Sequence, residues 1–166
     1  MAGAQSQYWG QGFSPRGEKN RFVLPADFRP VLRNSSEGQR NLCLDMHHKH
    51  PCLVGFGESR AAGFEDQIAH EERVAIERGE PFDRDVREAQ LCGFAVVSFD
   101  ESGRFILPEY LSEQAEITDA LYFHGGIKQF TIWSPAVLMA MGPEWATAKS
   151  SCRAKMAEHA AKASRK

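Results

Sequence analysis

The sequence predicts an α+β fold built from two similar halves. The stretch RFVLP at residues 21–25 recurs as RFILP at residues 104–108, with only Val23 exchanged for Ile106. Around both copies, short apolar runs bounded by turn residues alternate with helical patterns, which is typical of strands mixed with helices. With 166 residues, the chain is long enough for two half-domains that share one core.

The second half begins with two predicted strands, AVVSF (95–99) and RFILP, joined by the turn DESG (100–103). Pro108 ends the second of these strands because proline has no N–H to extend a ladder. The segment EYLSEQA that follows predicts a short helix.

A hairpin and a helix complete the second half. ALYFH (120–124) and KQFTIW (128–133) are predicted strands around Gly125-Gly126, a pair that suits a two-residue turn. Ser134-Pro135 is a strong helix start, and this helix is expected to run to Gly142.

The first half repeats the same order of elements with more variation. RGEKN is the predicted turn, RFVLP the strand and ADFRPVLR the short helix. NLCLDM and PCLVGF form the predicted hairpin, joined by HHKH. A helix is expected next, with Phe64 and Ile68 on one face, and PFDRDVREAQLCGF (81–94) predicts another helix that leads into the second half.

These elements divide the chain into three parts. We expect a first repeat at 10–80, a linker helix with the second repeat at 81–142, and a basic, Ala-rich C-terminal tail at 143–166. Two copies in one chain indicate an internal pseudo-dimer, in which each half covers the open strand edges of the other.

Composition places the chain among ordinary globular proteins, with 42% apolar and 25% charged residues. No apolar run reaches the roughly 20 residues of a membrane span, and the N-terminus lacks an apolar signal core, so we expect a cytoplasmic protein without membrane association. The four cysteines form no CxxC pair and are expected to be reduced thiols.

Charge is sorted along the chain, although the net charge is only −2. Residues 149–166 carry six bases and one acid, and residues 13–40 carry six bases and three acids. Residues 58–88 hold ten acids and five bases. Local fields of this kind, more than net charge, steer partners.

With these repeated motifs, the sequence resembles the MraZ family of the SpoVT/AbrB-like swapped-hairpin group. The resemblance covers about residues 10–142 and depends on the duplicated turn and strand, with Asp-x-x-Gly-Arg intact at 100–104. The first copy is Gly17-Glu18-Lys19-Asn20-Arg21, where the family usually has Asp-x-Lys-Gly-Arg. Asn20 is a suitable substitute for glycine because asparagine tolerates the left-handed turn conformation.

The resemblance implies two AbrB-like swapped-hairpin repeats that form an intrachain pseudo-dimer with flanking helices. It also implies a nucleoid-associated repressor of the division and cell-wall gene cluster, which binds repeated boxes in double-stranded promoter DNA. The same resemblance implies that the protein self-associates into a ring-like homo-oligomer. It also implies that the protein needs no cofactor and catalyses no reaction. The alternatives are a ring-forming protein-interaction module that has lost DNA binding, and an AbrB-like antitoxin.

The candidate DNA-binding residues are basic and lie at or near the two turns. A guanidinium that follows a turn can contact phosphates or guanine edges, whereas its structural alternative is to pair with a local carboxylate such as Asp100. The candidates are Arg21, Lys19, Arg104, Arg16 and Arg29, with Arg33 in the surrounding basic field. Because 100–119 holds six acids and one base, we expect Arg21 to contribute more than Arg104.

Three further features leave alternatives. The tail is either a frayed, largely disordered helix or an electrostatic anchor for DNA that does not depend on sequence. CLDMHHKHPC (43–52) contains two cysteines and three histidines, yet its spacing fits no standard zinc finger and alternating strand positions scatter the ligands, so we expect no metal. No catalytic motif is found, so we expect no enzyme.

Overall fold

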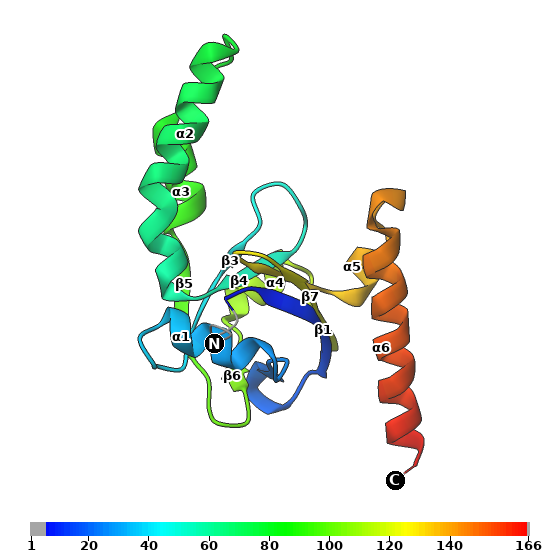
Figure 1. Cartoon of the computed structure of the whole chain (residues 1–166). Coiled ribbons are helices and arrows are strands. Elements are labelled where there is room, and N and C mark those ends of the chain that lie inside the picture. The colour runs from blue at the N-terminus through cyan, green and yellow to red at the C-terminus, as the bar shows by residue number, and fades with distance from the viewer. Residues whose placement is uncertain (1–5, 166) are drawn as a thin grey trace, which may run out of the picture.

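The computed structural model describes residues 6–165, which form a mixed α+β fold with an antiparallel sheet (Figure 1). The strands are β1 Tyr8–Pro15, β2 Arg21–Val23, β3 Asn41–Met46, β4 Leu53–Phe56, β5 Ala95–Ser98, β6 Arg104–Ile106, β7 Ala120–Gly126 and β8 Phe130–Trp133. The α-helices are α1 Phe28–Ser35, α2 Phe64–Glu77, α3 Arg84–Cys92, α4 Glu109–Gln114, α5 Pro135–Met139 and α6 Ala146–Ser164. Short 3-10 helices are η1 Glu18–Asn20, η2 Glu58–Gly63 and η3 Pro143–Trp145.

The two halves are interleaved in the sheets. The large sheet has the order β1-β7-β8-β4-β3-β5, so the first strand of each half pairs with the hairpin of the other half. β2 and β6 form a separate two-stranded ribbon, with one strand from each half. Neither half therefore completes its backbone hydrogen bonds without the other.

Backbone hydrogen bonds repeat between the halves in matched pairs. The N–H of Leu24 donates to the carbonyl of Gly103 at 2.9 Å, and the N–H of Leu107 donates to the carbonyl of Asn20 at 3.0 Å. These four residues are two pairs of positions separated by 83 residues, the spacing of the repeated stretch. The sequence repeat thus corresponds to a structural repeat with approximate twofold character.

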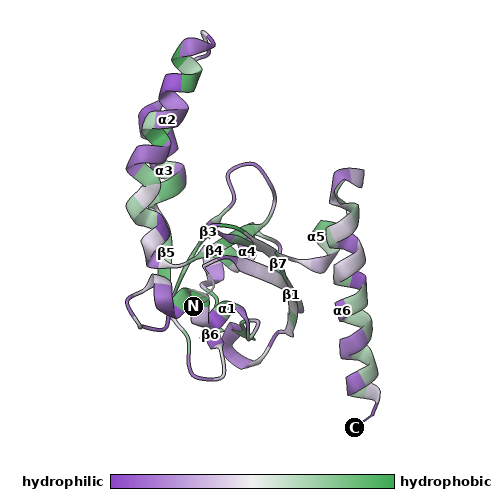
Figure 2. Ribbon diagram, in the orientation of Figure 1, coloured by the Kyte–Doolittle hydropathy of each residue, from purple (hydrophilic) through white to green (hydrophobic). Residues whose placement is uncertain are grey.

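The sheet has an inner and an outer face. The inner face, the ribbon, α1 and α4 together enclose the main apolar core, whose largest side chains include Phe22, Phe28, Phe105, Phe123 and Phe130. On the outer face, α2 and α3 cover β3 and β4 around Phe56 and Phe64, while α5 and α6 cover β7 and β8 around Trp133. Figure 2 shows hydrophilic residues along α2 and α6, which extend away from these contacts.

Most predicted elements are present, with one shifted turn. Both hairpins form, and α3 begins after Asp83, whose carboxylate accepts a hydrogen bond from the N–H of Val86 at 3.2 Å. β7, however, continues through Gly125 and Gly126, and β8 begins only at Phe130, so the turn falls two residues later than predicted. A Cβ at Gly125 would collide with the carbonyl oxygen of Tyr8, so this glycine permits the close approach of β1.

The C-terminal region differs more from expectation. α5 begins at Pro135 as predicted but ends at Met139, before Gly142, and the Ser134 hydroxyl makes no capping hydrogen bond. The tail, for which the sequence left a frayed helix or an electrostatic anchor for DNA as alternatives, forms the long helix α6, in which Ala148 and Cys152 are buried. The core therefore extends past Gly142.

Two general features bear on function. Between residues 6 and 165, no helix combines the length and the hydropathy that a membrane crossing requires. All four cysteines are free thiols, and Cys43 and Cys52 lie in different apolar clusters.

Candidate nucleic-acid interface

The β2–β6 ribbon places both repeat arginines on one exposed face. Arg21 pairs with Ile106 and Val23 pairs with Arg104, and these four side chains are exposed. The central pair, Phe22 and Phe105, is buried in the core at 1% and 2% exposure. Because strand residues alternate between faces, fixing the two phenylalanines inside forces both arginines outward, with about 8 Å between their Cα atoms.

The turns before the two arginines share one closing hydrogen bond and one left-handed position, but they differ at Lys19, which is left-handed while its counterpart Ser102 is not. In the first, Gly17 N–H donates to the carbonyl of Arg21 at 2.8 Å, and in the second, Asp100 N–H donates to the carbonyl of Arg104 at 3.0 Å. Gly103 has φ +82°, and the corresponding Asn20 has φ 58°, as predicted for an asparagine in place of glycine. The carbonyl group of each arginine is therefore held by the same backbone hydrogen bond.

Asn20 also joins the halves. Its side-chain amide donates to the carbonyl of Leu107 at 2.8 Å, across the ribbon. A glycine at this position could adopt the same backbone but could not make this hydrogen bond. The departure from the family's usual glycine thus adds a contact between the halves.

Arg104 is paired with a carboxylate. Its Nε donates to Asp100 Oδ2 at 2.7 Å, while Asp100 Oδ1 accepts from the N–H groups of Ser102 and Arg104 at 3.0 and 2.9 Å. The backbone N–H of Arg104, together with its guanidinium, holds the pKa of the Asp100 carboxyl below its usual value of 3.8. Arg104 is therefore held by a local carboxylate, which is the structural alternative that the sequence offered, while its side chain remains exposed on the ribbon.

Arg21 lacks such a partner because Gly17 stands where the second copy has Asp100. Within residues 6–165 its side chain makes no hydrogen bond or ion pair. Lys19 is also exposed, with a left-handed backbone at φ 58°, and Arg16 is exposed with one long contact to the carbonyl of Thr118 at 3.4 Å. The first turn thus holds three cations available to an anionic partner.

Arg29 has a structural contact that the sequence did not reveal. Its Nε and Nη2 donate to the carbonyl of Leu24 at 3.2 and 2.8 Å, and its guanidinium lies directly against Gly103. A Cβ at Gly103 would collide with this guanidinium. Arg29 therefore supports the second turn from within the molecule, and only part of its side chain is accessible.

Folding mixes the charges that the sequence separates. Arg40 from the first basic segment pairs with Glu101 of the second turn at 3.4 Å. Conversely, Glu109 and Glu113 of α4 line an open groove of about 600 Å³ with Arg16 and Lys19. The acidity of 100–119 is thus shared between both turns, and the difference between Arg21 and Arg104 depends on Asp100 instead.

Comparison with known proteins gives the family. No family model matches the chain. The transcriptional regulator MraZ of Gluconacetobacter diazotrophicus is 30% identical over 119 residues, which are 71% of this chain and 72% of the relative. The chain belongs to the MraZ family. Its relatives also include the MraZ regulators of Gluconobacter oxydans, 30% identical over 121 residues (70% and 69% of the two chains), and Roseiflexus castenholzii, 29% identical over 118 residues (71% and 74%).

Two ribbon residues of this MraZ-family chain were missed as site candidates. Val23 and Ile106 are 41% and 50% exposed, whereas the strand pattern alone predicts only that they lie in strands. The alternation in RFVLP and RFILP indicates this exposure, since it places each of them on the same face as the arginine two positions earlier. Apolar side chains beside an arginine suit contact with a thymine methyl group or a sugar.

The histidine-rich loop of this MraZ-family chain is a packed turn. The Nδ1 of His47 accepts from the N–H groups of Lys49 and His50 at 3.0 and 3.2 Å, and the His50 ring packs edge-on to Trp145 at 5.0 Å. Burial, with the neighbouring histidines and cations, lowers the pKa of His47 to about 4. Among the described residues, no three His, Cys, Asp or Glu side chains are grouped to hold a metal ion.

Proposed function

We propose that the protein is a sequence-specific DNA-binding repressor that acts on the division and cell-wall gene cluster. Membership of the MraZ family, whose curated relatives are named transcriptional regulators, supports a role in transcription. The proposal involves no catalytic step and no cofactor, and it places the protein in the cytoplasm at the nucleoid.

The observation that carries the proposal is the outer face of the β2–β6 ribbon. Two arginines lie there on adjacent strands, and an unpaired Arg21 is flanked by Lys19 and Arg16. A two-stranded ribbon fits the major groove of B-DNA, where arginine can bind guanine O6 and N7 together. Lysine and the second arginine would then contact phosphates, which set position and orientation.

We further propose that residues 10–80 and 81–142 are swapped-hairpin repeats, each of which contributes one turn to the DNA-binding face. The exchange of first strands between the halves and the reciprocal hydrogen bonds of Leu24 and Leu107 support this arrangement. One chain would then present a pseudo-twofold pair of turns to one short box.

A single ribbon offers few base contacts, so we propose that several protomers act together. Protomers joined head-to-tail in a ring would engage repeated promoter boxes, and linkage would raise the affinity through effective concentration. Light scattering should then detect several protomers per particle. A stable 18.6 kDa monomer that retains full promoter affinity would contradict this part.

The experiment compares two duplexes. One spans the promoter of the division and cell-wall cluster in the genome that encodes this chain, and the other has the same length and composition but a shuffled order. Fluorescence anisotropy at two salt concentrations should show tighter binding to the promoter, by about 10³-fold or more at physiological salt. Equal affinities would refute sequence-specific binding, and no binding to either duplex would favour a protein-interaction module.

A further inference from the structure

Helix α6 carries a second concentration of positive charge. Its described residues from Lys149 onward include five bases and one acid. Beyond Cys152 the helix leaves the core, and every residue from 156 to 165 is exposed. Because most of these residues do not pack against the core, core packing does not explain why the segment is rich in cations.

Two cations near the end of α6 are free. Lys155 pairs with Glu158 at 3.5 Å, whereas Lys162 and Arg165 take part in no ion pair within residues 6–165. On the exposed half of the helix, Lys155, Glu158, Lys162 and Arg165 recur at helical spacing on one face, and the opposite face carries Met156 and small alanines. Cations in the last turn also interact favourably with the helix dipole, and this is the structural alternative that would explain Lys162 and Arg165.

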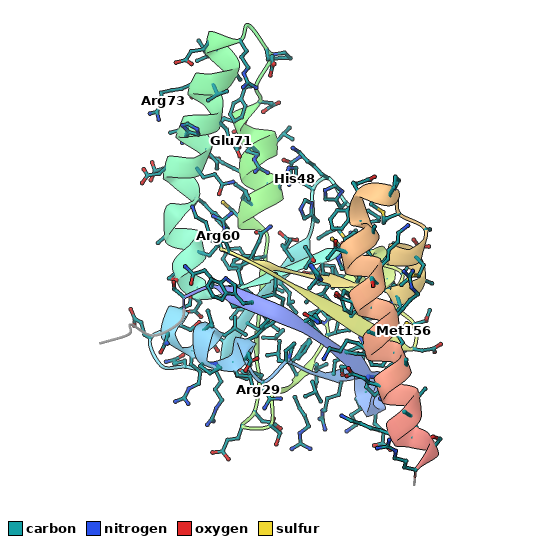
Figure 3. All side chains as sticks on the ribbon, turned by 45° about the vertical axis from the view of Figure 1, so that its right-hand side comes forward. Arg29, His48, Arg60, Glu71, Arg73 and Met156 are labelled. Atoms are coloured by element: carbon teal, nitrogen blue, oxygen red, sulfur yellow. The ribbon has the colours of Figure 1, made fainter. Side chains whose placement is uncertain are left out.

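The position of α6 decides between these explanations. The ring of His159 lies 5.1 Å from that of Phe13 in β1, which fixes the helix beside this strand. From Phe13, β1 continues about 10 Å to Arg16 at the first turn, and from His159 the helix continues about 9 Å to Arg165. Figures 1 and 3 both show α6 passing the sheet and ending at the side of the molecule where β6 and Arg29 lie.

We propose that the end of α6 is a second DNA-contacting element, in which Lys162 and Arg165 bind phosphates beside the box contacted by the ribbon. The inference rests on the proposed DNA-binding function. Lysine and arginine on an exposed helix neutralise phosphates without reading bases, and the described part of the exposed segment has no Phe, Tyr or Trp on which a base could stack. The helix would therefore add affinity for any duplex and leave sequence preference to the ribbon.

The size of the effect follows from counterion release. Each phosphate contact contributes about 0.9 to the slope of log affinity against log salt. Loss of two contacts should make the slope shallower by about 1.8. When salt rises from 50 to 200 mM, the affinity of both proteins falls, and the factor of this fall should be about 12-fold smaller for the variant than for the unchanged protein.

The test uses the full chain with Lys162→Gln and Arg165→Gln, since glutamine keeps the helix propensity. The matched control is Arg73→Gln with Arg78→Gln, in helix α2 and at its C-terminal end, far from the end of α6 (Figure 3). Both control side chains are exposed and make no ion pair within the described residues, so the two variants change net charge equally. Circular dichroism and light scattering check that helix content and assembly are the same in both variants.

The expected result is a shallower salt slope for the α6 variant alone, with equal loss on promoter and shuffled duplexes. Equal slopes for the α6 variant and the control would overturn the inference, as would a slope unchanged from the original protein. A change in particle mass at unchanged slope would assign α6 to contacts between protomers. If the unchanged protein binds neither duplex, the proposed function itself fails, which is a distinct outcome.

Discussion

Asp100 makes the two ribbon arginines unequal, and their replacement by alanine should show it. Arg21 and Arg104 occupy corresponding positions, but only Arg104 already donates to a carboxylate, at 2.7 Å. A free guanidinium can aim two parallel N–H donors at guanine O6 and N7 from either edge, whereas the Nε of Arg104 donates to Asp100 and this side chain is less free to turn. Arg21→Ala should therefore weaken promoter binding more than Arg104→Ala.

The magnitude follows from the contacts available to each side chain. Loss of a bidentate arginine–guanine contact costs about 1–3 kcal/mol, which is about 5- to 150-fold in affinity. This loss falls on the promoter duplex alone, so the preference for promoter over shuffled DNA should drop by the same factor. Arg104→Ala instead leaves the Asp100 carboxylate unneutralised near the phosphates, which should lower the affinity for both duplexes to a similar extent.

The assay is fluorescence anisotropy with promoter and shuffled duplexes for the original protein and both variants. Neither substitution touches the buried Phe22–Phe105 pair, so thermal melting should show that both variants remain folded. If Arg104→Ala lowers the promoter preference as much as Arg21→Ala, or more, the role assigned to Asp100 is wrong.

Three further perturbations test other parts of the structure. Asp100→Asn keeps an oxygen acceptor for the turn but removes the charge that holds Arg104, so affinity for both duplexes should rise in the anisotropy assay, and unchanged affinity would contradict this. Ending the chain after residue 145 removes Cys152, which is buried in the same cluster as Trp133, and should lower Tm by about 5–10 °C, whereas ending it after residue 156 should leave Tm nearly unchanged. Because the pKa of His47 falls from 6.5 to about 4, the unfolded chain takes up the proton first, and stability should decrease as the pH falls from about 6.5 to 4. His47→Asn keeps an acceptor for the loop N–H groups, so chemical denaturation at pH 7 and pH 4.5 should show a smaller difference for this variant than for the original, and an equal difference would exclude His47 as the cause.

Local features of the fold were predictable because local chemistry determines them. Both hairpins, the N-cap of α3 at Asp83 and the left-handed backbone of Asn20 follow from short-range patterns. The outward direction of Arg21 and Arg104 follows from alternation around one buried phenylalanine in each strand. These features depend on residues within a few positions of each other.

Features that depend on the crossing of the halves could not be predicted in the same way. The pairing of Arg40 with Glu101 joins residues 61 positions apart, and it mixes charges that are separate in the sequence. The contact of Arg29 with the second turn likewise requires that α1 lie beneath the other repeat. The charge run predicted that Arg21 contributes more than Arg104, and this order remains a prediction, for which the structure supplies a different reason, the pairing of Arg104 with Asp100.

The C-terminal helix shows the limit of composition as a guide. An Ala-rich basic segment predicts helix propensity but not docking, since two small buried residues, Ala148 and Cys152, suffice to hold its first turns against the sheet. Alanine and cysteine give little hydrophobic signal in a sequence, although both are often fully buried.

Footprinting of the promoter of the division and cell-wall cluster tests the central claim most directly. The original protein should protect short repeated boxes, and Arg21→Ala at the same concentration should lose that protection while the protein stays folded. Uniform protection, no protection, or boxes that Arg21→Ala still protects equally well would contradict a DNA-reading role for the β2–β6 ribbon.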